Sequence, residues 1–143
     1  MTWGTSLSES ARRDLEALID AGLRAADPII ADARWLPPMP FVVTLGGELR
    51  ALAVDEAAQP DRNPVRLVGA AIRLLREEAI EARAVALATG SRLEADRTDV
   101  VEVWAEHREG AAITVLRPYP RRGARADERA YRGSRLIWPG SND

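Results

Sequence analysis

The amino-acid sequence predicts an α+β fold: an antiparallel sheet of about five to six strands with two main helices on one face, in the order α-β-β-α-β-β-β-β. Apolar residues recur at helical spacing in two segments and alternate with polar residues in the others. Two helices are too few to supply the crossovers of a parallel sheet, which favours antiparallel strands. The length of 143 residues fits a single domain over residues 1–143.

The first helix is predicted over residues 6–26, where apolar side chains recur every three or four positions. Ser6 and Glu9 have the spacing of a capping box, in which two side chains bind the free amide groups at the start of a helix. Pro37, Pro38 and Pro40 follow and require extended backbone. A linker is therefore expected between the helix and the first strand.

A hairpin is predicted from Phe41 onward, because the apolar period changes there from helical to two. A three-residue loop that ends at Gly47 gives the best register. This register keeps the apolar side chains on one face, namely Phe41, Val43, Leu49, Ala51 and Ala53.

The second helix is predicted from Pro64 to about Glu81, with Asn63 as its N-cap. Its apolar stripe consists of Leu67, Val68, Ala71, Ile72, Leu75 and Ala79. Strands are then expected at residues 83–89, 99–107 and 112–117, with a last short strand near 135–138.

A second hairpin is predicted to turn at residues 107–110, with Gly110 in the left-handed position. This register places one set of side chains on the inner face of the sheet: Val101, Val103, Ala105, Ile113 and Val115. The outer face then carries Glu102, Trp104, Glu106, Thr114 and Leu116. The outer face is therefore not wholly polar.

A resemblance to a known group of proteins rests on four short segments, in this order: Pro40-Phe41 before the glycine turn, residues 103–110, residues 115–119 and the closing residues 136–139. On these residues, the chain from Pro40 onward resembles a group of small bacterial α+β proteins without an established activity. The resemblance implies a fold and no catalytic residue. The predicted topology is also similar to the layered domains of the profilin and roadblock type, whose members mostly bind partners.

The composition excludes several kinds of chemistry, since the chain has no cysteine and its basic residues other than His107 are all arginine. Disulfides, thiolate metal sites and lysine Schiff bases are impossible. The motifs G-x-x-x-x-G-K, G-x-G-x-x-G and G-x-S-x-G are absent from the sequence. We expect no cofactor and no bound metal.

The first ten residues do not have the pattern of a secretory signal, and the sequence contains no apolar run of roughly 20 residues. The absence of cysteine also suits a reducing compartment. We therefore expect a cytoplasmic protein that does not enter membranes.

Trp104 and Leu116 are the favoured candidates for a partner-binding surface. They lie close together across the second predicted hairpin, with Glu102 and Glu106 at the rim. If nothing covers this face, it is an apolar patch suited to dimerisation or to binding another protein. The alternative is that the first helix, Trp35 or the arginine-rich segment covers it.

A second hypothesis is a small enzyme that uses carboxylates near His107, drawn from Asp99, Glu102 and Glu106. Against this, Glu102 and Glu106 are about 13 Å apart along one strand face, and His107 points to the other face. The loop residues Glu94, Asp96 and Asp99 could bind a hard cation, but their spacing matches no known calcium loop.

A third hypothesis is anion or nucleic-acid binding by the arginine-rich connection, residues 118–134, which precedes a flexible tail at 139–143. Residues 117–143 contain seven arginines and three acidic residues, and Arg121, Arg122 and Arg125 are its candidate anion ligands. The net charge of −2 for the whole chain argues against a nucleic-acid partner. The sequence thus favours a non-enzymatic binding or assembly domain whose partner is another protein or a second copy.

Overall fold

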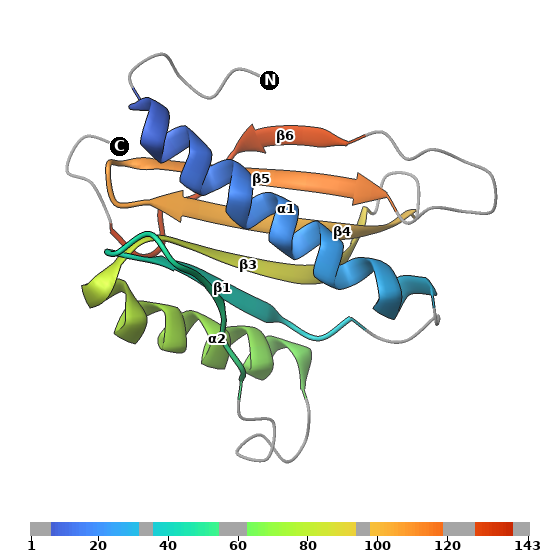
Figure 1. Cartoon of the computed structure of the whole chain (residues 1–143). Coiled ribbons are helices and arrows are strands. Elements are labelled where there is room, and N and C mark those ends of the chain that lie inside the picture. The colour runs from blue at the N-terminus through green and yellow to red at the C-terminus, as the bar shows by residue number, and fades with distance from the viewer. Residues whose placement is uncertain (1–6, 32–35, 55–62, 94–97, 119–127, 139–143) are drawn as a thin grey trace.

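The computed structural model describes residues 7–31, 36–54, 63–93, 98–118 and 128–138. The strands form one antiparallel sheet in the order β2-β1-β3-β4-β5-β6 (Figure 1). Two long helices pack on this sheet, which confirms the predicted α+β class. In chain order the elements are α1 (Glu9–Ala31), β1 (Met39–Thr44), β2 (Leu49–Ala51), α2 (Pro64–Glu78), the 3-10 turn η2 (Ala79–Glu81), β3 (Ala82–Leu93), β4 (Thr98–His107), β5 (Ala111–Pro118) and β6 (Arg129–Arg132).

The start of α1 differs from the expected capping box. Ser8 is the residue before the helix, and its hydroxyl accepts a 3.1 Å hydrogen bond from the amide of Ala11. Ser6 lies outside the described residues, and Glu9 pairs with Arg13 instead. The carboxylate of Glu109, in the β4–β5 turn, accepts a 2.6 Å hydrogen bond from the Ser8 hydroxyl. A residue distant in sequence therefore completes this cap.

Both predicted hairpin registers are confirmed. Phe41 pairs with Ala51 and Val43 with Leu49 across β1 and β2, and the three-residue loop ends at Gly47. Residues on β4 and β5 pair as expected around the turn at Gly110. The two turn glycines have φ angles of 89° and 111°, which side-chain-bearing residues rarely adopt.

The second helix starts as the sequence predicts. The side chain of Asn63 accepts a 2.9 Å hydrogen bond from the amide of Val65, and Pro64 occupies the first turn. The helix is α-helical to Glu78 and continues as η2 to Glu81. Its fully buried side chains, Leu67, Ala71 and Leu75, belong to the predicted apolar stripe.

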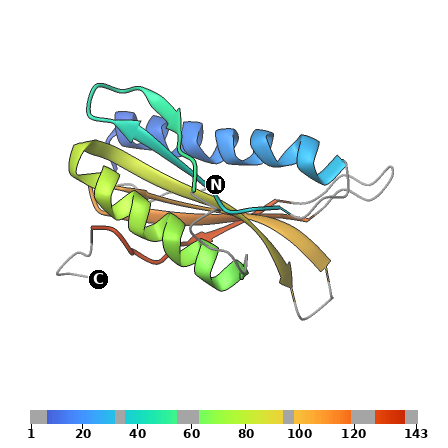
Figure 2. The same cartoon turned by 90° about the horizontal axis from the view of Figure 1, so that it is seen from below.

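The two helices lie on opposite faces of the sheet, so the prediction that both cover one face is wrong (Figure 2). α1 packs on the face that carries Val103 and Val115, and α2 packs on the other face over β1 and β3. The reason is that β3 is buried on both sides, with Ala84, Ala86 and Ala88 facing α1 and with Val85 and Leu87 facing α2. The continuous apolar run at residues 84–88 is the feature of the sequence that predicts a strand buried on both faces.

The predicted last strand near residues 135–138 is also wrong. The sixth strand is Arg129–Arg132, which lies within the segment expected to be a connection and pairs with β5. The backbone then leaves the sheet edge at Gly133. The amides of residues 136–138 bind a side chain of β4 instead of a neighbouring strand.

Candidate functional site

Trp104 lies on the outer face of the sheet, the face that carries α2, but only 6% of its surface is exposed. It packs in a cluster with Leu75 of α2 and with Ile137 and Trp138 near the C-terminus. The indole N–H donates a 2.7 Å hydrogen bond to the carbonyl of Ser134. Trp104 is therefore not an exposed binding residue in this conformation. Residues 134–138 and α2 cover it, rather than α1; Trp35 lies outside the described residues.

Glu106 is fully buried on the same face, and its carboxylate organises the residues that cover it. The backbone amides of Leu136, Ile137 and Trp138 donate to its two oxygens at 2.7, 2.9 and 2.8 Å. Three successive amides around an anion form a favourable binding concavity. Sequence reasoning placed Glu106 at the rim of an open patch and missed this role, because no local pattern links it to residues thirty positions away.

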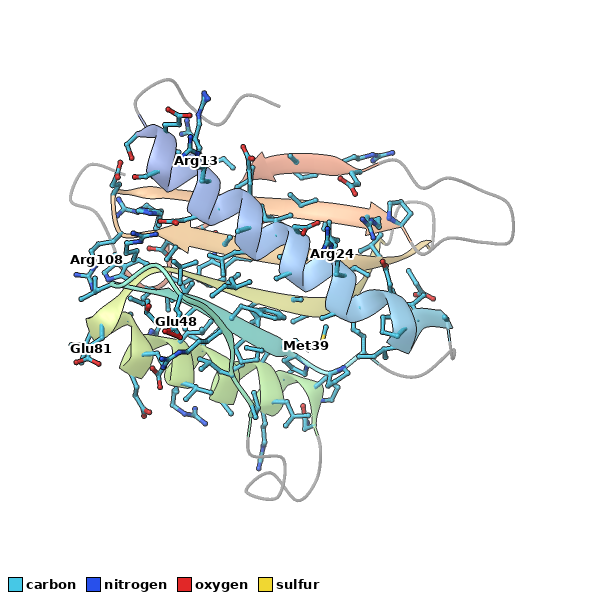
Figure 3. All side chains as sticks on the ribbon, viewed as in Figure 1. Arg13, Arg24, Met39, Glu48, Glu81 and Arg108 are labelled. Atoms are coloured by element: carbon cyan, nitrogen blue, oxygen red, sulfur yellow. The ribbon has the colours of Figure 1, made fainter. Side chains whose placement is uncertain are left out.

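Arg108 secures the same segment from one end of the sheet (Figure 3). Its guanidinium lies 5.2 Å from the centre of the Trp138 ring, a cation–π contact. It also donates to the carbonyls of Ala79 and Ala82, at 2.5 and 2.9 Å, where η2 meets β3. The covering segment is thus held to the body by an aromatic contact as well as by hydrogen bonds.

The outer face continues beyond Trp104 onto β5 and β6, away from α2. We call this area the outer patch: Glu102, Thr114, Leu116, Arg129 and Tyr131. Cross-strand pairing places Glu102, Leu116 and Arg129 in one row, and the neighbouring row contains Trp104, Thr114 and Tyr131. Tyr131 is 49% exposed, and Leu116 is partly exposed. The predicted neighbours Glu102 and Leu116 therefore meet on this part of the sheet.

Glu102 is the titratable group of the outer patch whose environment is most unusual. Partial burial on the sheet raises the pKa of its carboxyl above 4.5. Arg129 is exposed, and among the described residues neither side chain forms an ion pair. The patch therefore presents a negative and a positive group on the two sides of Leu116.

His107 is buried on the opposite, α1-facing side of the sheet. Its Nε2 lies 2.9 Å from Asp14 Oδ2, and its Nδ1 accepts a 3.0 Å hydrogen bond from the amide of Glu109. Arg83 donates to the other Asp14 oxygen at 2.8 Å. Both ring nitrogens of His107 are therefore engaged in holding α1 to the sheet.

The residues of the predicted carboxylate enzyme do not converge. Glu106 and His107 point to opposite faces, and Asp99 is exposed near the far end of β4. In the described part of the chain, the His, Asp and Glu side chains form no group of three that could hold a metal ion. Glu94 and Asp96, the other candidate cation ligands, lie outside the described residues.

The proposed anion ligands Arg121, Arg122 and Arg125 also lie outside the described residues. Arg117, at the edge of that segment, pairs with Asp27 of α1 at 3.1 Å and with Glu128 at 3.0 Å. This arginine therefore fastens α1 to β5.

Comparison with known proteins gives no relative: no family model, curated protein or solved structure matches this chain. Within the described ranges, no helix combines the length and apolar character needed to cross a bilayer. The protein has an α+β fold with a six-stranded antiparallel sheet, one partly open sheet face and a buried carboxylate that binds residues 136–138.

Proposed function

We propose that this chain is a non-enzymatic protein-binding domain that self-associates through the outer patch. The observation that carries the proposal is the row Glu102–Leu116–Arg129, in which an apolar side chain lies between opposite charges on adjacent strands. A symmetric dimer uses the same surface on both copies, so the surface must be complementary to itself.

The row meets this requirement. Neighbouring strands are about 4.8 Å apart, so Glu102 and Arg129 are equally far from Leu116 on its two sides. A two-fold axis parallel to β5 and passing over Leu116 stacks the two copies of Leu116 on each other. The same axis brings Glu102 of each copy opposite Arg129 of the other. Each charge then has a partner that it lacks among the described residues of its own chain.

The composition of the outer patch also supports a protein interface. Tyrosine and arginine are enriched in such interfaces, and Tyr131 exposes about half of its surface beside Leu116. Burial by a second copy would remove this apolar area from water. The burial of Trp104 moves the predicted interface from the centre of the sheet toward β5 and β6 without changing the face that it uses.

The enzymatic and nucleic-acid alternatives have less support. The proposed acid–base residues lie on opposite faces, with both nitrogens of His107 and both oxygens of Glu106 already hydrogen-bonded within the chain. Anion binding by the arginine-rich segment would depend on Arg121, Arg122 and Arg125, which the structure does not describe. Arg117, which precedes them in the sequence, is already paired with two carboxylates.

Light scattering over a concentration series tests the proposal with two charge-reversal variants, Glu102→Arg and Arg129→Glu. Each variant alone places like charges opposite each other at both ends of the interface, so we expect weaker dimerisation than in the native chain. An equimolar mixture restores two opposite-charge contacts, and we expect it to form heterodimers. The control is Arg132→Glu, the same charge change on β6 at a position that faces the other side of the sheet.

A native chain that is monomeric at every concentration would overturn the proposal. A dimer that neither Glu102→Arg nor Arg129→Glu weakens more than the control does would also overturn it, because the interface would then lie elsewhere. Rescue in the mixture is the decisive result, since loss of dimerisation in one variant alone could follow from a local folding defect.

A further inference from the structure

The C-terminal residues 134–138, which we call the strap, lie on the outer face as a bound peptide would. The side chains that hold the strap contact its backbone. Trp104 binds the carbonyl of Ser134, Glu106 binds the amides of residues 136–138, and Arg76 donates to the carbonyl of Leu136 at 3.4 Å. The site therefore recognises a run of amides that lacks proline.

Two side chains of the strap add specific contacts. Trp138 stacks under the guanidinium of Arg108, and Nε of Arg135 lies 4.0 Å from a carboxylate oxygen of Glu106. The other side chains are less committed, since Ser134 and Leu136 are exposed and no residue of the strap is fully buried. A short peptide with an arginine three residues before a tryptophan is the chemical class that fits these contacts.

The strap follows β6 directly, and this links it to the proposed dimer. β4 and β6 run in the same direction, because each pairs antiparallel with β5. The two-fold axis that pairs Glu102 with Arg129 places β6 of the second copy over β4. Within one chain, Gly133 bonds to Ala112, and Ala112 pairs with Glu106, so Gly133 and Glu106 are at the same position along the strands. In the dimer, Gly133 of the second copy therefore lies over Glu106.

We propose that the site formed by Trp104, Glu106, Arg108 and Arg76 accepts the strap of a second copy, so that the two chains of the dimer exchange their C-terminal segments. This inference rests on the proposed function, because the axis of the outer patch brings the second strap within reach. Exchange keeps every hydrogen bond of the strap and changes only the chain that supplies it.

The absence of native cysteine allows a direct test by chemical cross-linking. One chain carries Arg76→Cys and a size tag, and the other carries Leu136→Cys. Both positions are exposed, and Arg76→Cys gives up only the 3.4 Å hydrogen bond to Leu136, so the contacts of Trp104, Glu106 and Arg108 with the strap remain. The mixed chains are treated with a short bis-maleimide at a concentration where light scattering shows a dimer. The double variant in one chain, at high dilution, shows that the reagent spans the two positions.

We expect a severalfold higher yield of the tagged–untagged product than from a control mixture of Arg66→Cys with Leu136→Cys, since Arg66 is about 15 Å away along α2. Adding Glu106→Gln to the tagged chain should lower the yield, because a side-chain amide cannot accept all three strap amides. A dimer whose mixture gives no more product than the control would overturn strap exchange and leave the proposed function intact. A chain that is monomeric throughout would overturn both.

Discussion

His107 and Asp14 form a buried hydrogen bond between β4 and α1, with Nε2 of the imidazole 2.9 Å from the carboxylate. Because Nδ1 accepts the amide hydrogen of Glu109, the neutral ring carries its proton on Nε2 and donates it to Asp14. Arg83 binds the second oxygen of the same carboxylate. One acidic residue of α1 therefore joins the helix to two strands.

Asp14→Ala should lower the free energy of unfolding by about 3 kcal/mol, because it leaves His107 and Arg83 without their acceptor in a buried site. Denaturant titration measures the loss. Arg24→Ala is the control: its pair with Asp20 is exposed, so a change within about 0.5 kcal/mol is expected. Asp14→Ala stability equal to that of the control would contradict the structural role of the cluster.

Ser8→Ala should cost about 1 kcal/mol, since Ser8 caps the first turn of α1. The effect should depend on pH. The hydroxyl and the amide of Ser8 donate to Glu109 and lower the pKa of its carboxyl below 4.5. This contribution is present above pH 4.5 and is lost as the pH falls through the folded-state pKa. The destabilisation by Ser8→Ala should therefore be larger near neutral pH than in acid, and an equal loss at both pH values would exclude the coupling.

Glu102→Gln should stabilise the chain at neutral pH. Burial raises the pKa of the Glu102 carboxyl in the folded state above 4.5, so the folded chain binds this proton more tightly than the unfolded chain does. The carboxyl therefore lowers stability as the pH rises through that folded-state pKa. The measurement is the difference in unfolding free energy between the variant and the native chain, at dilutions where both are monomers. This difference should be constant below pH 4.5, increase as the pH rises through the folded-state pKa and be constant again above it; a difference independent of pH would contradict the burial of this group.

Gly133→Ala should destabilise the chain by about 1–3 kcal/mol, because its new Cβ would lie 2.9 Å from backbone atoms of Ile113. The backbone of β5 cannot move aside as a flexible side chain could. Gly46→Ala is the matched control, since its Cβ would have only the Thr44 hydroxyl as a neighbour, at 3.8 Å. Thermal unfolding of both variants checks the prediction, and a melting temperature of Gly133→Ala equal to that of Gly46→Ala would contradict it.

The candidate site shows where sequence reasoning succeeds and where it stops. Alternation along β4 and β5 assigned Glu102, Trp104 and Leu116 to the outer face, and the structure bears this out. The same pattern could not tell that residues 134–138 cover Trp104, because the contact joins segments thirty residues apart. No local pattern marks Asp14, because its partners His107 and Arg83 are brought to it only by the fold.

Elements whose causes are local could be predicted from the sequence. The glycines at positions 47 and 110 set the hairpin registers through their backbone freedom, and Asn63-Pro64 set the start of α2 through its cap. Two features follow from contacts that form in the folded chain: the helices cover opposite faces, and the chain after Gly133 binds Glu106 instead of extending the sheet. Those outcomes depend on which buried surfaces and hydrogen-bonding groups meet across the fold, and a buried carboxylate is stable only where donors from elsewhere in the chain reach it.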